Sequence, residues 1–136
     1  MSVAEQKLSH LTAASRFDLC CSGECIRTLF GASHITYNPR AEGCERMLKV
    51  LLHGACSYDC AYCDVRLQRE RLSLSPDELA GTFLGFWREG LVDGLFLSSG
   101  IPRDVDLVMH ELVETGEILR RRGYDGYLHL KILPGA

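Results

Sequence analysis

The chain has 136 residues, of which 46% are hydrophobic and 24% are charged, and its formal net charge is −3. This composition is typical of one globular domain with its own core, and it excludes a disordered chain. A small acidic net charge provides no general attraction for a nucleic-acid backbone. No run approaches the roughly 20 apolar residues of a membrane span, and the start lacks the apolar centre of a signal peptide, so we expect a cytoplasmic protein.

The first part of the chain, residues 1–46, is expected to be an extension made of a helix and a cysteine-containing loop. Residues 3–19 repeat apolar side chains with a helical period, which predicts an amphipathic helix. Those side chains are Leu8, Leu11, Ala14 and Phe17. From residue 20 onward turn residues are frequent and periodicity is weak, which predicts a loop that ends near Cys44.

Four of the seven cysteines lie in that extension: Cys20, Cys21, Cys25 and Cys44. Together with His34, three of them (Cys20, Cys25 and Cys44) form a possible Cys₃His set for zinc. Their spacing matches no established zinc pattern. We therefore favour small, partly buried free thiols under a loop. The odd total is typical of a reducing compartment, in which thiolates bind metals rather than form a disulfide framework.

The second part, residues 47–136, shows the alternation of a parallel α/β sheet. Short apolar runs predict strands at 48–52, 94–98 and 127–133. Ser75, Pro76 and Glu78 are a helix-start signal and Gly90 a stop signal, so a helix should span 76–89. A second apolar period from Val105 to Leu119 predicts another helix, which Gly123 ends. Strands joined by such crossovers are parallel, and their sites gather at the carboxyl ends of the strands.

The third strand alternates polar and apolar residues. Its polar positions are Tyr127, His129 and Lys131. A structural strand in a parallel sheet is usually apolar on both faces, so a polar face indicates a pocket. We therefore expect His129 and Lys131 to be pocket residues.

Cys56, Cys60 and Cys63 lie within eight residues, directly after the first strand. Spacings this tight favour metal ligands over disulfides. A structural zinc site needs four ligands, and the nearest candidate for the fourth is His53. Three thiolates on a [4Fe–4S] cluster would instead leave one iron open to a ligand that is not protein. The spacing C-x3-C-x2-C favours the cluster, although a non-catalytic zinc or electron-transfer module stays open as an alternative.

The stretch Ala55-Cys56-Ser57-Tyr58-Asp59-Cys60-Ala61-Tyr62-Cys63, which follows a strand and has an aromatic residue before its last cysteine, resembles the signature of radical S-adenosylmethionine (radical SAM) enzymes. The resemblance implies the front portion of a partial (β/α) barrel with parallel strands. It also implies a [4Fe–4S] cluster on the three cysteines whose open iron binds SAM, and reductive cleavage of SAM to a 5′-deoxyadenosyl radical.

Further cofactor-binding residues follow from the same resemblance. Tyr62 is expected near the adenine of SAM. Ser98, Ser99 and Gly100 occupy the place of the family's segment that meets the SAM amino group. The glutamate of that family segment is absent here. A tight strand-to-helix turn explains the three residues equally well. Lys131, from the polar face of the third strand, completes the set.

The sequences of residues 48–63, 95–101 and 128–136 are similar to those of radical SAM proteins assigned to DNA modification or repair. Such proteins are associated with a uracil-DNA-glycosylase-like partner. The resemblance implies a nucleic acid or such a protein as partner, together with an external electron donor. It covers roughly residues 15–136, of which residues 47–136 correspond to the first βαβαβ units of the barrel. We therefore expect the chain to be truncated, or to be completed by another chain that covers the open edge of its sheet.

Overall fold

The computed structural model describes residues 3–14, 25–29, 32–40, 43–58, 60–61, 63, 65 and 71–136. Their elements, in chain order, are α1 (Val3–Ala14), β1 (Cys25–Leu29), β2 (Ala32–Arg40), β3 (Gly43–Leu51), α2 (Pro76–Arg88), β4 (Gly94–Ser98), α3 (Val105–Arg121) and β5 (Leu128–Leu130). The fold of these ranges is mixed α/β. None of their helices is both long enough and apolar enough to cross a membrane.

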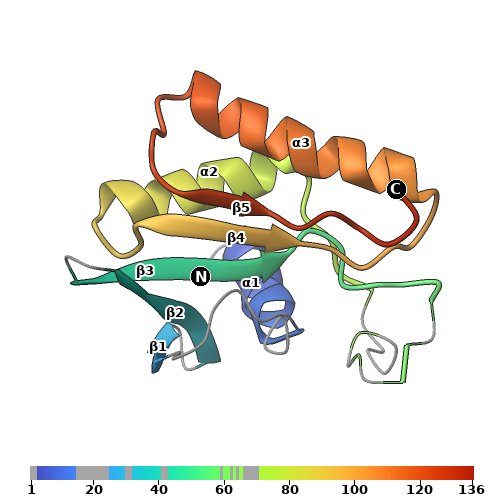
Figure 1. Cartoon of the computed structure of the whole chain (residues 1–136), viewed down its shortest axis with the longest axis horizontal. Coiled ribbons are helices and arrows are strands. Elements are labelled where there is room, and N and C mark those ends of the chain that lie inside the picture. Colours follow the sequence, from blue (N-terminus) through green and yellow to red (C-terminus); the bar gives the residue numbers. More distant parts are fainter. Residues whose placement is uncertain are drawn as a thin grey trace.

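The strands form one open sheet in the order β1-β2-β3-β4-β5. β3, β4 and β5 run parallel to one another, so the predicted parallel sheet is confirmed. β3 begins earlier than predicted and β5 is shorter than predicted. Figure 1 shows the three parallel arrows pointing the same way, with α2 and α3 running alongside each other above them. The carboxyl ends of these strands therefore meet at one edge of the sheet.

The loop predicted from residue 20 to near Cys44 is wrong for most of its length, because this segment forms β1, β2 and the start of β3. Leu29 pairs with Ala32 and Arg40 pairs with Gly43, so both antiparallel pairs are joined by short connections. Pro39 gave a turn signal in the sequence. It lies in β2 beyond the residues that pair with β1, where its missing N–H removes no ladder hydrogen bond on that side.

The two predicted helices after the cysteine motif are confirmed, and their ends follow from local chemistry. Ser75 Oγ accepts from the Glu78 N–H at 3.2 Å, and Glu78 Oε2 accepts from the Ser75 N–H at 2.9 Å, which is a complete capping box at the start of α2. Gly90 and Gly123 follow α2 and α3 with φ of 73° and 92°, a conformation that favours glycine.

All three helices contribute to one hydrophobic core. Leu8 and Leu11 of α1 are 2% and 1% exposed, as the apolar period of this segment predicts. They share the core with Leu48 and Val50 of β3, with the buried faces of α2 and α3, and with β4. Because this core fixes β3 and β4 along their length, it also fixes the points at which the chain leaves these strands.

An ion pair at the opposite end of the parallel strands links β3 to the segment before β4. The Arg46 guanidinium donates to both carboxylate oxygens of Asp93, from Nε at 3.0 Å and from Nη2 at 2.9 Å, and the Arg46 backbone N–H adds a bond of 2.9 Å. The hydrogen bond from the Arg46 side chain holds the pKa of the Asp93 carboxyl below its ordinary value of 3.8, against the opposing effect of burial. The pair therefore stabilises the ionised form of Asp93.

We expect Asp93→Asn to lower the free energy of unfolding by about 1 kcal/mol at neutral pH, a small value because both side chains are partly exposed and water screens the pair. A folded pKa below the unfolded one gives a contribution that is complete above the ordinary pKa. It disappears as the pH falls through the lowered value. Urea titrations should show the variant and the wild type converging at acid pH, and a difference that does not change with pH would contradict this.

Candidate metal and cofactor site

The cysteine loop, residues 56–63, follows the carboxyl end of β3, at the edge of the sheet where β4 also ends (Figure 1). Cys56, Cys60 and Cys63 are free thiols of intermediate exposure. Cys56 and Cys63 pack against the hydrophobic core. The Cys63 N–H donates to the Cys60 carbonyl at 3.1 Å, which closes a turn between them. The loop thus presents three thiols that are neither sealed in the core nor fully exposed.

The donor set suits a cluster in type, number and exposure, because thiolates are the ligands of iron–sulfur clusters. Within the described ranges, however, no three His, Cys, Asp or Glu side chains lie close enough together to hold a metal ion. Cluster binding therefore requires the three sulfur atoms to converge. Tyr62, predicted near the SAM adenine, lies outside the described residues, as do Asp59 and Asp64.

The ends of β3 and β4 are joined by hydrogen bonds that continue beyond the strands. The Gly100 N–H donates to the His53 carbonyl at 2.8 Å, and the His53 N–H donates to Ser99 Oγ at 3.1 Å. Further on, the N–H and the hydroxyl of Ser57 both donate to the Ile101 carbonyl, each at 2.8 Å. Because Ser57 is the neighbour of Cys56, these bonds fix the start of the cysteine loop against the turn after β4.

The predicted cofactor-binding segment of Ser98, Ser99 and Gly100 forms this turn, so the structure brings it beside the start of the cysteine loop. A Cβ on Gly100 would lie 2.3 Å from the Ala55 carbonyl oxygen, so only glycine permits this approach. The Ser99 hydroxyl, besides accepting from His53, donates to the Gly100 carbonyl at 2.6 Å. Ser98 is 3% exposed. These contacts are those of a tight turn between packed segments.

The segment after β5 also approaches the cysteine loop. The Lys131 N–H donates to the Leu97 carbonyl at 3.0 Å, and the Lys131 side chain is exposed. Farther along, the Pro134 carbonyl oxygen lies 3.5 Å from the Tyr58 hydroxyl. Three segments that follow three parallel strands therefore meet at one edge, as the sequence predicts for this type of sheet.

A row of aromatic and basic side chains crosses the parallel strands. Leu128 and Leu130 of β5 pack on the core beneath α3, so the alternate residues face away from that helix. The His129 ring lies 4.6 Å from the Phe96 ring, and Lys49 Nζ lies 5.8 Å from the centre of the same Phe96 ring. The Tyr127 hydroxyl is 3.2 Å from His129 Nδ1, which completes the row. The predicted alternation of polar and apolar faces is confirmed for β5 (Leu128–Leu130), whereas Lys131 lies beyond the end of this strand.

His53, the nearest candidate for a fourth zinc ligand, is already engaged. Its Nε2 lies 2.6 Å from Glu111 Oε2, and the imidazole side chain is only 8% exposed. Arg103 pairs with the other carboxylate oxygen of Glu111. Coordination through Nε2 would break this hydrogen bond, so the structure does not favour a zinc site completed by His53. Sequence reasoning missed Glu111 and Arg103, since nothing local marks a side chain that meets a partner 58 residues away.

The described members of the second set of cysteines lie in the antiparallel part of the sheet. Cys25 is in β1, His34 in β2 and Cys44 in β3, whereas Cys20 and Cys21 lie outside the described residues. The structure does not describe the side chains of this set. The favoured interpretation, free thiols, and its alternative, a Cys₃His zinc site, therefore both stay predictions.

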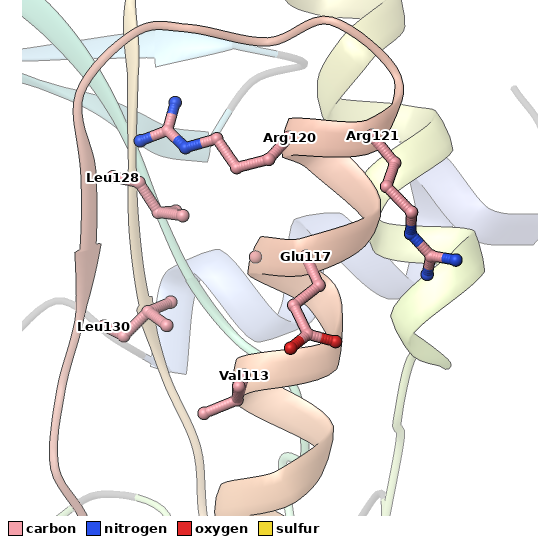
Figure 2. Close-up of a pocket in the computed structure, with 7 residues that line it drawn as sticks. Val113, Glu117, Arg120, Arg121, Leu128 and Leu130 are labelled. Carbon is pink, nitrogen blue, oxygen red and sulfur yellow. The ribbon is translucent and has the colours of Figure 1, made fainter.

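A cavity of about 630 Å³ lies between α3 and β5. Its lining is mostly apolar with basic and acidic residues at the rim: Val113, Gly116, Glu117, Arg120, Arg121, Leu128 and Leu130. Figure 2 shows Leu128 and Leu130 directed from β5 toward α3, and Arg120 extending across the end of this space. None of the predicted site residues lines the cavity, so it is separate from the cysteine loop.

Comparison of the chain with protein families, curated proteins and solved structures returns no match. The function is therefore inferred from the chain's own residues and their arrangement.

Proposed function

We propose that Cys56, Cys60 and Cys63 bind a [4Fe–4S] cluster with one open iron, and that the chain is a radical SAM enzyme or the front portion of one. The observation that carries the proposal is the position of three free, half-buried thiols on one short loop at the carboxyl edge of a parallel sheet. When bound, the cluster and SAM supply one-electron reductive cleavage to a 5′-deoxyadenosyl radical.

The chain's own contribution is to bind the cluster and to hold its cysteine ligands in place. Each of the three cysteines acts as a thiolate, the form that binds metal. Cys56 and Cys63 lie against the core, so two of the three ligands start from anchored positions. Cys60 has no such packing and is the ligand that we expect to move most when the sulfur atoms converge.

The proposed roles in SAM binding differ among the predicted residues. The Gly100 N–H and the Ser99 hydroxyl are bonded to the backbone of His53, in the base of the cysteine loop (residues 53–56). We therefore propose that Ser98, Ser99 and Gly100 shape the site rather than donate to SAM. Tyr62 and Lys131 are proposed to contact SAM, Tyr62 from the cysteine loop and Lys131 from the end of β5.

The finer assignments are part of the same proposal. The three parallel strands would be the front of a partial (β/α) barrel, whose inner face would carry the row of Lys49, Phe96, His129 and Tyr127. On the basis of the resemblance, we also propose that the enzyme acts in nucleic-acid modification or repair. Its proposed partners are a uracil-DNA-glycosylase-like protein and an external electron donor, and its proposed location is the cytoplasm. The net charge of −3 gives no separate support for a nucleic acid.

Anaerobic reconstitution with iron and sulfide tests the proposal against the zinc module. We expect about four iron and four sulfide per chain, the composition of one cubane cluster. Purified protein that instead retains about one zinc and takes up no sulfide would contradict the proposal and support a structural zinc site.

A further inference from the structure

Three charged or titratable side chains outside the cysteine motif form a connected group behind the cysteine loop. His53 follows β3, Glu111 lies in α3, and Arg103 lies in the connection between β4 and α3. Glu111 accepts from His53 Nε2 at 2.6 Å through one oxygen and pairs with Arg103 through the other. The group thus joins three separate elements at the edge of the sheet that carries the cysteine loop.

The exposed fraction of the side chain increases along this group, from His53 to Arg103. The side chains of His53, Glu111 and Arg103 are 8%, 24% and 47% exposed. A carboxylate can only accept, so His53 Nε2 carries the hydrogen and the bond is charge-assisted. Burial weakens the competition from water for this bond. The contact between His53 and Glu111 should therefore be stronger than a surface pair.

His53 is held by its backbone as well as by its ring. Its N–H donates to Ser99 Oγ and its carbonyl accepts from the Gly100 N–H. With the ring bonded to Glu111, the residue is fixed to two segments at once, the turn after β4 and the helix α3. Displacement of the His53 backbone would break its bonds to Ser99 and Gly100 and would also pull the ring away from Glu111.

Cys56 lies only three residues beyond His53, and Ser57 on its far side is bonded to Ile101. Ala55 lies between His53 and Cys56, and its carbonyl oxygen packs so closely on Gly100 that a Cβ on Gly100 would lie 2.3 Å from it. The backbone of Cys56 is therefore held from both directions. The His53 contact is the anchor on one side and Ser57 is the anchor on the other.

We propose that Glu111 and Arg103 are positioning residues that act through His53 to hold the base of the cysteine loop, so that Cys56 is presented for cluster binding. Among the described residues, no hydrogen bond or ion pair joins Glu111 or Arg103 to the proposed cluster ligands. The role of Cys56 rests on the proposed function, whereas the anchoring of the loop's base does not. The two parts can therefore fail separately.

Amide hydrogen exchange of the metal-free protein tests the anchoring without any cluster. In Glu111→Gln we expect exchange at Ser57 and Gly100 to accelerate about tenfold, because a charge-assisted bond is replaced by a weaker neutral one. Arg103→Met should cause a smaller acceleration at the same two amides. Glu114→Gln, an exposed residue of the same helix, is the matched control and should leave them unchanged.

The pattern of exchange separates positioning from general stabilisation. An equal acceleration at amides of the core strands β3 and β4, or none at Ser57 and Gly100, would overturn the proposal. Iron release from reconstituted protein to a chelator is the second measurement, and it should be faster in Glu111→Gln than in Glu114→Gln. If the wild type takes up no iron while the local acceleration is observed, the proposed function fails and the anchoring of the loop stands.

Discussion

Cys60→Ala is expected to lose cluster binding almost completely while the protein stays folded. Two thiolates cannot replace three on a cluster that already lacks a fourth protein ligand. Cys60 is half-buried, and it is Cys56 and Cys63 that pack on the core, so removal of the Cys60 sulfur should change the free energy of unfolding by less than about 0.5 kcal/mol. The measurement is iron and sulfide content after anaerobic reconstitution, together with a urea titration.

Cys44→Ala is the control for that experiment, because it removes a thiol from β3 and leaves the cysteine loop intact. It should bind as much iron as the wild type. Equal iron in Cys60→Ala and the wild type would contradict the assignment of the ligands. Loss of iron in Cys44→Ala alone would move the metal site to the second set of cysteines.

Gly100→Ala is expected to destabilise the fold by about 1–3 kcal/mol and to displace the start of the cysteine loop. The added Cβ would lie 2.3 Å from the Ala55 carbonyl oxygen and 3.0 Å from the His53 carbonyl oxygen. Both neighbours are backbone atoms, which cannot move aside by rotation of a side chain. The strain should therefore be relieved by moving Ala55 and Cys56, with a loss of bound iron beyond that expected from stability alone.

Gly85→Ala is the matched control. Gly85 lies inside α2, and a Cβ there would meet no atom within 4 Å. Alanine in a helix interior is more favourable than glycine, so this variant should gain about 0.5–1 kcal/mol and keep its iron. Thermal unfolding and iron content of the two variants can be compared directly. A Gly100→Ala protein as stable and as rich in iron as Gly85→Ala would disprove the close packing of the two strand ends.

Local sequence chemistry predicted the second part of the chain well. The capping box at Ser75 and the terminal glycines Gly90 and Gly123 act within a few residues, and the structure has both helices where these signals place them. β4 is a continuous apolar run that is buried throughout, so its bounds were also predictable. β5 is shorter than predicted because ladder pairing with β4 extends only from Leu128 to Leu130, a limit that no residue type marks.

The antiparallel strands β1 and β2 were not predicted. Frequent turn residues, Pro39 among them, predicted a loop through this segment. The structure tolerates Pro39 because β2 extends past the end of β1 there. That overhang depends on the pairing of two strands, which composition in a local window does not reveal.

The place of the three cysteines in the fold was predictable from the sequence, but the contacts that hold their loop were not. The spacing of the three cysteines is local, and their place after a strand follows from the order of the elements. The contact of His53 with Glu111 and the bonds of Ser57 to Ile101 join residues 58 and 44 positions apart. Such contacts are set by the packing of α3 and β4 on the sheet, so only the folded arrangement shows them.

The most direct measurement is the electron paramagnetic resonance spectrum of the reconstituted, reduced protein, recorded with and without SAM. An open-site cluster on Cys56, Cys60 and Cys63 predicts a [4Fe–4S]⁺ signal whose shape changes when SAM binds to the open iron. A cluster signal that SAM leaves unchanged would show that no iron is open, and the absence of any cluster signal in protein that holds zinc would contradict the account altogether.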